Sequence, residues 1–246
     1  MHTIDLNCDM AEGLPNDALL MPWISSANIA CGYHAGDEET MKRTVAHALQ
    51  YGVAIGAHPG FADKANFGRT EMQLPLQEVY ELVSEQIFML QKIINEHGAK
   101  LHHVKPHGAL YNMAAKDSEL AAIIARAVYD IDQHLLLYGL SSSHSISEAK
   151  KIGLTTASEV FADRTYQDNG GLTPRTQPNA LIETEEASLQ QVLQMIEQKT
   201  VTSIHGKKVP ITAETICLHG DGAHAVAFAK HIHQTLQQNQ IGIQSL

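Results

Sequence analysis

The chain has 246 residues, 44% of them hydrophobic, and a formal net charge of -10 at pH 7. This length and composition suit a folded α/β protein and exclude a disordered one. The acidic balance, with no basic run longer than two residues, argues against nucleic acid and anionic membranes as partners. No secretory signal and no apolar stretch of roughly 20 residues is present, so we expect a cytoplasmic protein.

Seven short runs along the chain carry strand signals. One of them, 135–138, is continuously apolar, which is typical of a parallel strand buried on both faces. In chain order, strands are predicted at 3–8, 27–31, 53–57, 102–105, 135–138, 156–161 and 215–218.

Helical patterns lie between these strands. Asp37 is a predicted N-cap, and Gly52 is the matching stop signal at the other end of that helix. The longest apolar stripe follows Pro75 and ends at Gly98, and another helix is predicted from about Ser118. Further helices are predicted over 145–152, 185–198 and 223–238.

The alternation of strands and helices predicts a parallel α/β architecture. A closed or nearly closed barrel is favoured, because polar residues follow almost every strand; an open doubly wound sheet, the alternative, gathers its chemistry at a switch point. No linker or repeat divides the chain, so a single domain over 1–246 is expected. The segment 163–181 is the longest loop-like stretch, which favours a lid or binding loop.

The first strand and the turn after it are crowded with polar groups. Alternation places Asp5, Asn7 and Asp9 on one face, which points inward in a barrel, and Glu12 follows in the turn. Two carboxylates and an amide could hold a metal, a cation or a reacting water. A helix cap or a buried polar network is the alternative.

Histidines end the next two strands. His34 and His58, with Asp9, form a candidate two-histidine, one-carboxylate metal set. A purely structural histidine is the alternative for each of them.

A lysine and a histidine flank Pro106 at the end of the fourth strand. Lys105 could neutralise a carboxylate or phosphate, and His107 could move a proton. The alternative is a buried Lys–Asp pair. We favour function, because a lysine is an unusual choice for packing an apolar strand.

Charged residues flank the long loop. Arg164 and Arg175 suit bidentate binding of a carboxylate or phosphate, and Glu159 and Asp163 lie close to them in sequence. A surface salt-bridge cluster is the alternative.

The last predicted strand ends in His219 and Asp221, and residues 220–225 match G-x-G-x-x-A only weakly. No G-x-x-x-x-G-K-[ST] occurs, so ATP would not be held by a P-loop of this chain. The cysteines, Cys8, Cys31 and Cys217, are expected to be free thiols.

Together these motifs resemble the LamB/YcsF family. The matching stretches are DLNCD (5–9), SANIACGYHAGD (26–37), GAHPG (56–60), NFGR (66–69), VKPHGALYN (104–112), EVFADR (159–164) and CLHGD (217–221), in family order over nearly the whole chain. Two departures occur: Ala11 stands where glycine is expected, and Thr70 where a second arginine is frequent. Neither departure touches a His, Lys or Asp of these motifs.

The resemblance implies a seven-stranded (β/α) barrel similar to those of glycoside hydrolases and polysaccharide deacetylases. It also implies the A subunit of an ATP-hydrolysing 5-oxoprolinase, active with partner subunits B and C. That enzyme converts 5-oxo-L-proline, ATP and two waters to L-glutamate, ADP and phosphate. ATP with Mg²⁺ is the expected cofactor, and a divalent metal bound directly by this chain is a further expectation.

The residue types suggest which side chains bind substrate, which activates water and which transfer protons. Lys105 and Arg164 would hold the substrate carboxylate or the transferring phosphoryl group. Asp9 or Asp221 would activate water, and His58, His107 or His219 would move protons. Asp163 is placed with this catalytic group. Substrate binding is assigned to Asn7, Glu12, His34, Glu159, Arg164 and Arg175.

Two other functions remain open. One is a metal-dependent hydrolase or deacetylase of a sugar or amide that uses no ATP. The other is a non-catalytic subunit that presents 5-oxoproline to its partners.

Overall fold

The computed structural model describes residues 3–218 and 225–246, and its centre is a closed parallel barrel. Seven strands form it in the order β1-β2-β3-β4-β5-β6-β9, and β9 pairs with both β6 and β1 to close the ring. The barrel strands are β1 (Thr3–Met10), β2 (Ser26–Ala30), β3 (Ala54–His58), β4 (His103–Val104), β5 (Leu136–Leu140), β6 (Thr155–Phe161) and β9 (Thr215–Leu218). All seven predicted strands are confirmed, and the open sheet is excluded.

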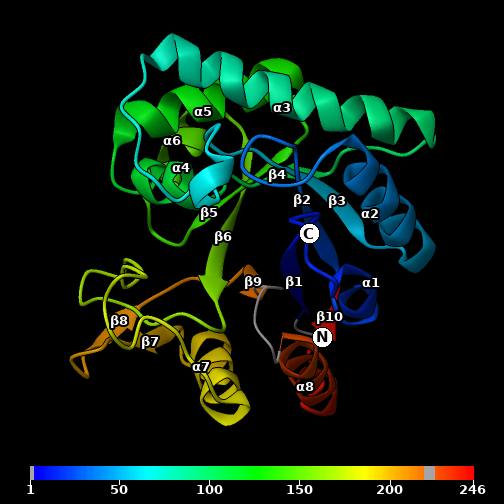
Figure 1. The fold of residues 1–246 in the computed structure, drawn as a ribbon. Helices are drawn as coiled ribbons and strands as arrows, with labels where there is room; N and C mark the ends of the chain where they lie inside the picture. Colours follow the sequence, from blue (N-terminus) through cyan, green and yellow to red (C-terminus); the bar gives the residue numbers. More distant parts are fainter. Residues whose placement is uncertain (1–2, 219–224) are drawn as a thin grey trace.

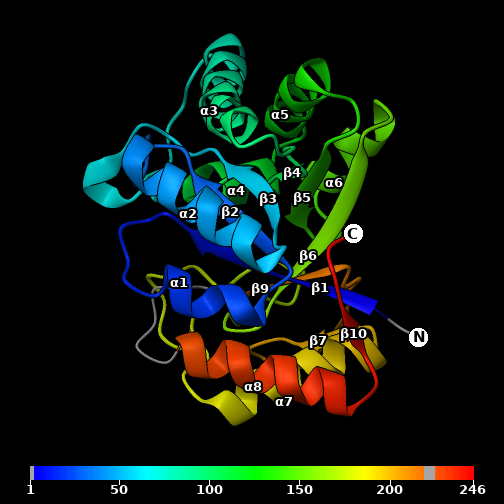
Figure 2. The ribbon, with the colours of Figure 1, turned by 90° about the vertical axis from the view of Figure 1, so that its right-hand side faces the viewer.

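Helices surround this barrel. Figures 1 and 2 show α3 and α5 side by side along one flank, with α7 and α8 on the opposite flank. The eight α-helices of the described residues are α1 (Asp17–Leu20), α2 (Glu38–Tyr51), α3 (Leu76–Glu96), α4 (Gly108–Ala114), α5 (Ser118–Ile131), α6 (His144–Lys151), α7 (Glu185–Glu197) and α8 (Ala225–Gln238). None of the described helices has the length and apolar character of a membrane span.

Capping residues place the helix ends where the sequence predicts them. The Asp37 side chain accepts from the backbone N–H of Thr40 at 2.8 Å, and Gly52 ends α2 with a φ of 67°. Asp117 caps α5 in the same way, since its side chain accepts from the N–H groups of Glu119 and Leu120. Each cap satisfies backbone groups that the helix itself leaves unpaired.

The sequence pattern missed the shortest elements. These are α1, α4, two 3₁₀ turns at Met21–Trp23 and Lys64–Asn66, the antiparallel pair β7 (Thr200–Thr202) and β8 (Lys208–Pro210), and β10 (Gly242–Ile243), which pairs with β1. Each of these missed elements has only two to seven residues. The segment 163–181 is irregular as predicted, apart from isolated bridges such as Arg164 to Leu181.

The barrel interior is polar, and Asp5 lies at its centre. The Asp5 carboxylate accepts hydrogen bonds from the hydroxyls of Ser25 (2.6 Å), Ser26 (2.7 Å), Tyr138 (3.0 Å) and Thr215 (2.6 Å). Four donors satisfy a fully buried carboxylate. The buried polar network, and not a site at the barrel mouth, is therefore the role that the structure gives Asp5.

Candidate active site

Residues from four strand ends meet at one mouth of the barrel. Asp9 comes from β1, His58 ends β3, Lys105 directly follows β4, and Glu159 lies on β6. Parallel strands present their carboxyl ends at the same rim, which brings these residues together from distant parts of the sequence.

Lys105 is the centre of a buried ion cluster. Its Nζ lies 2.8 Å from Asp9 Oδ1 and 2.8 Å from Glu159 Oε1, with the side chain only 2% exposed. Asn7 Oδ1 at 3.2 Å and Cys217 Sγ at 3.1 Å complete its surroundings. Burial opposes the charge, but the two carboxylates outweigh it and raise the pKa of Lys105 well above its usual value. Lys105 is therefore charged, and its ammonium lies between the carboxylates of Asp9 and Glu159.

Asn28 holds Asn7 and Asp9 of this cluster in place. Its Nδ2 donates to Asn7 Oδ1 at 2.7 Å and to Asp9 Oδ1 at 2.8 Å. The Asn28 Oδ1 lies 2.8 Å from His103 Nε2, so that ring nitrogen carries the proton and donates it. His103 thereby sets the orientation of the Asn28 amide that positions Asp9.

Gly56 on β3 makes room for the His103 ring. A Cβ at position 56 would lie 2.1 Å from His103 Nε2, which a buried ring cannot accommodate without moving. We expect Gly56→Ala to lower the free energy of unfolding by about 2 kcal/mol, measured by urea denaturation.

Gly171→Ala is the matched control for that substitution. The atom nearest to its new Cβ would be the Asn169 side-chain oxygen at 3.1 Å. Because that side chain belongs to an exposed loop and can yield, the change should stay within about 0.5 kcal/mol. Equal effects of the two substitutions would contradict the tight packing of His103.

A second cluster lies beside the first and contains three imidazoles and one carboxylate. Glu12 Oε1 lies 3.4 Å from His34 Nε2, 3.9 Å from His58 Nε2 and 3.3 Å from His107 Nδ1. His58 Nε2 and His107 Nδ1 are 2.9 Å apart. The rings of His34 and His107 stack with centroids 3.8 Å apart. One carboxylate oxygen and three ring nitrogens, all of which can bind a metal, therefore lie close together.

Burial controls the charge of these imidazoles. It lowers the pKa of His34, and it holds the pKa of His107 well below the usual histidine value, with the neighbouring rings of His58 and His34 adding to the effect. At neutral pH His34 and His107 are thus neutral, with lone pairs available for an acid or a metal.

A cavity of about 400 Å³ opens over both clusters. Asp9, Glu12, His58, Lys105 and His107 form part of its wall. Four further cationic side chains also line it: Arg69, Lys116, Arg164 and Arg175. A cavity lined by carboxylates and by several cations suits a small, negatively charged substrate.

The long loop forms one side of this cavity. Residues 172–176 line it, and Arg164 anchors the loop from inside by donating to Thr173 O at 2.6 Å and to Ala180 O at 3.3 Å. Burial, together with the nearby charge of Arg175, lowers the pKa of Arg164 to about 10. Two of its N–H groups are thus committed to the loop, while Arg175 is partly exposed at the cavity wall.

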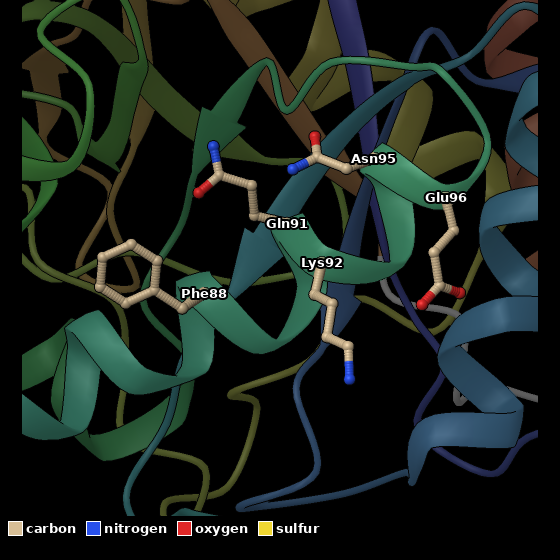
Figure 3. Close-up of a pocket in the computed structure, with 5 residues that line it drawn as sticks. All are labelled: Phe88, Gln91, Lys92, Asn95 and Glu96. Carbon is tan, nitrogen blue, oxygen red and sulfur yellow. The ribbon is translucent and has the colours of Figure 1, made fainter.

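A larger hollow of about 500 Å³ lies elsewhere, on the outer face of α3 (Figure 3). Its lining side chains, Phe88, Gln91, Lys92, Asn95 and Glu96, all project from that one helix. It is open and brings together no residues from different elements, so the candidate site remains at the barrel mouth.

The structure separates the predicted site residues into three groups. Asp9, Glu12, His58, Lys105, His107, Arg164 and Arg175 line the cavity. Asn7, His34 and Glu159 are buried and do not line the cavity; they contact Glu12 or Lys105. Their role in substrate binding stays a prediction. Asp163 is half-buried and does not line the cavity. His219 and Asp221 lie outside the described residues.

Sequence reasoning also missed several cavity residues. Arg69, Glu71, Asn112 and Lys116 line the wall without having been predicted as site residues. Arg69 and Asn112 fall inside the 66–69 and 104–112 motifs, which was the available signal. The predicted metal set also changes, because His34 and His58 group with Glu12 and His107 while Asp9 Oδ1 pairs with Lys105.

Comparison with known proteins gives consistent matches. Residues 4–246 match the model of the LamB/YcsF family. The A subunit of 5-oxoprolinase from Bacillus cereus (strain Q1) is 52% identical over 249 residues, covering 99% of this chain and 98% of the relative. The crystal structure of a lactam utilization protein from Thermus thermophilus superposes with a TM-score of 0.93 at 38% identity, covering 99% of this chain and 100% of that one.

More distant structures share the barrel. A family 4 carbohydrate esterase from Streptomyces lividans has a TM-score of 0.53 at 14% identity, covering 99% of this chain and 91% of the esterase. At that identity the likeness extends to the fold alone. The expected similarity to this group of barrels is thereby confirmed.

Proposed function

This chain belongs to the LamB/YcsF family, and we propose that it is the A subunit of an ATP-hydrolysing 5-oxoprolinase that opens the lactam ring of 5-oxo-L-proline. Relatives about half identical over the full chain carry that subunit's name. The observation in this molecule that supports the proposal most is the cavity at the barrel mouth, which combines the carboxylate of Asp9, paired with Lys105, with cations around the wall.

The chemistry of a lactam explains why ATP is needed. The amide is stabilised by resonance and its nitrogen is a poor leaving group. Transfer of the terminal phosphoryl group of ATP to the lactam oxygen makes the ring carbon electrophilic. ADP leaves in that transfer. Water then adds to the ring carbon and the carbon–nitrogen bond breaks, which gives an acyl phosphate, and a second water cleaves the acyl phosphate to L-glutamate and phosphate.

In this proposal the cationic side chains of the cavity bind the negatively charged groups of the reactants. We assign the substrate carboxylate and the phosphoryl oxygens to Arg69, Lys116 and Arg175, because these side chains line the cavity. Arg164 belongs to the same positive wall but is largely committed to holding the loop.

Asp9 is assigned to the attacking water. Its Oδ1 is held by Lys105 and Asn28, and its Oδ2 faces His58 Nε2 at 3.4 Å, at the wall of the cavity. A carboxylate fixed in this way can accept the proton that water loses as it attacks the ring carbon. Lys105 then acts through Asp9, by donating to its Oδ1 and fixing its position.

Loss of the Arg175 charge should weaken substrate binding. We expect Arg175→Ala to raise KM for 5-oxoproline and to lower kcat/KM by about 10- to 100-fold, the value of one charge-assisted hydrogen bond. Steady-state glutamate release by the reconstituted enzyme measures the effect. Arg126→Ala is the control, since Arg126 pairs with Asp130 on the exposed face of α5. An unchanged KM for Arg175→Ala would contradict the assignment.

The proposal includes partners and location. Subunits B and C complete the enzyme, ATP enters with Mg²⁺, and the reaction takes place in the cytoplasm, with this chain as a single-domain barrel. The described residues that line the cavity include no phosphate-binding loop. We therefore propose that a partner subunit supplies much of the nucleotide site.

One experiment tests the proposal directly. Glutamate release from 5-oxoproline, with ATP and Mg²⁺, is measured with this chain alone and then with subunits B and C added. Turnover only in the mixture is the expected result. No turnover in either case would contradict it.

A second function has its own supporting observation. The cluster of Glu12, His34, His58 and His107 also suits a metal-dependent hydrolase or deacetylase of a sugar or amide that uses no ATP. Omitting ATP from the reconstituted mixture separates the two, because only the second function survives the omission.

A further inference from the structure

We infer that Glu12, His34, His58 and His107 form a binding site for one divalent transition-metal ion of the zinc type. Among the described residues they form a group whose ligand atoms all lie within 4.8 Å of one another. Three of the four residues are buried, and the Glu12 side chain is only 7% exposed.

The hydrogen bonds of two rings determine where their lone pairs point. His58 Nδ1 lies 2.7 Å from the backbone oxygen of Lys105, and His107 Nε2 lies 2.9 Å from that of Phe67. A carbonyl oxygen can only accept, so each of these ring nitrogens must carry the proton. The other nitrogens, His58 Nε2 and His107 Nδ1, are then bare in the neutral rings.

These two bare nitrogens face each other at 2.9 Å. Two lone pairs at that distance repel unless a cation or a proton lies between them. A metal ion, which binds both lone pairs at once, resolves the conflict without adding a proton.

The other two ligands are aimed at the same point and have no competing partners. Glu12 Oε1 and both ring nitrogens of His34 are buried without a hydrogen-bond partner. Buried polar atoms are normally satisfied, and a ligand explains such exceptions. Glu12 Oε1 lies within 3.4 Å of both His34 Nε2 and His107 Nδ1.

The spacing of the ligand atoms fits a tetrahedral ion. With metal–nitrogen bonds of about 2.0–2.1 Å, neighbouring ligands of a tetrahedron lie about 3.3 Å apart. Four of the six separations, 2.9, 3.3, 3.4 and 3.9 Å, lie around that value, and all six are within 4.8 Å. Three imidazoles and one carboxylate favour Zn²⁺, Co²⁺ or Fe²⁺ over Mg²⁺ and Ca²⁺, which prefer oxygen ligands.

The chain also supports these ligands in the way metal sites do. A metal-binding histidine usually donates its second N–H to a backbone carbonyl or carboxylate, as His58 and His107 both do. Two glycines leave room for the rings: a Cβ at Gly60 would lie 2.8 Å from His34 Nδ1, and one at Gly68 would lie 2.7 Å from His34 Cβ.

The ion would lie next to Asp9, since Asp9 Oδ2 is 3.4 Å from His58 Nε2. Metal binding itself is independent of the proposed lactam chemistry, because it is measured with no substrate present.

The test uses the full chain purified without chelator. Elemental analysis should find about one equivalent of a transition metal in the wild-type protein. After the ion is removed, Co²⁺ should restore one equivalent and give the strong visible absorption of a four-coordinate site. The thermal unfolding midpoint should rise with Zn²⁺, since binding to the folded state stabilises it.

Two variants make the result specific. Glu12→Gln keeps the size of the side chain and should lose the stoichiometric metal, the cobalt spectrum and the thermal shift. His134→Ala removes an exposed histidine far from the cluster in sequence and should keep all three. Circular dichroism of Glu12→Gln separates loss of metal from loss of fold.

Any of three outcomes would overturn the inference. The first is a wild-type protein that binds no more than traces of metal, in which case a shared proton joins His58 and His107. The second is cobalt binding by Glu12→Gln equal to that of the wild-type, and the third is replacement of the bound ion by Mg²⁺ at equal affinity. A negative result for metal binding does not change the result expected in the ATP-dependent assay, so the two proposals can be refuted independently.

Discussion

Replacing Lys105 with methionine is expected to destabilise the protein by about 3–5 kcal/mol, the cost of leaving buried charges without their partner. Asp9 and Glu159 each lie 2.8 Å from Lys105 Nζ, and Glu159 is fully buried. Without the ammonium, these carboxylates must either repel each other or take up a proton. Urea denaturation measures the loss, and glutamate release by the reconstituted enzyme should fall with it.

A double variant separates the structural effect from the functional one. Lys105→Met with Glu159→Gln removes one buried negative charge together with the positive one, so stability should partly return. Activity should not return, because Asp9 then lacks the cation that keeps it ionised. Lys151→Met is the control, since Lys151 pairs with Glu148 on the surface. Near-normal turnover of Lys105→Met would contradict the assigned role.

The second large effect is expected for Asp9→Asn. The substitution keeps the shape of the side chain and removes the oxygen proposed to accept the water proton. We expect kcat to fall by about 10²–10⁴-fold, the usual contribution of a general base, with a much smaller change in KM.

The amide introduced by Asp9→Asn would still contact Lys105 through its oxygen, so the fold should survive this change. Near-ultraviolet circular dichroism and the urea midpoint check that expectation. The control is Asp130→Asn, which removes a carboxylate from the exposed ion pair with Arg126. If Asp9→Asn raised KM and left kcat intact, Asp9 would be a binding group and not the base.

Site residues at the ends of strands could be predicted from the sequence, whereas some of those outside strands could not. Asp9, His58 and Lys105 were identified because each follows a short apolar run, and parallel strands bring such positions to one rim. Arg69 and Lys116 follow no strand, so the strand pattern did not indicate them, although Arg69 lies in the 66–69 motif and both line the cavity. Both lie outside helices and strands, so only the folded chain brings them to the cavity.

Ala11 is another position that the sequence indicates and that only the folded structure explains. Its backbone lies in the left-handed region, with a φ of 61°, and its N–H donates to Asp17 Oδ2 at 2.8 Å. That conformation favours glycine, which agrees with the expectation of glycine at this position. The sequence marked the departure, and only the folded turn explains it.

By itself the sequence determined the elements and their order. Hydrophobic periodicity placed all seven barrel strands and most helices, and caps such as Asp37 and Gly52 placed their ends, because those signals are local. The tertiary structure alone decided which charges meet. Lys105 pairs with Asp9 and Glu159, and Glu12 joins His34, His58 and His107, because barrel closure fixes which side chains share a small volume. Backbone carbonyls that no pattern reveals then fix which nitrogen of His58 and His107 is bare.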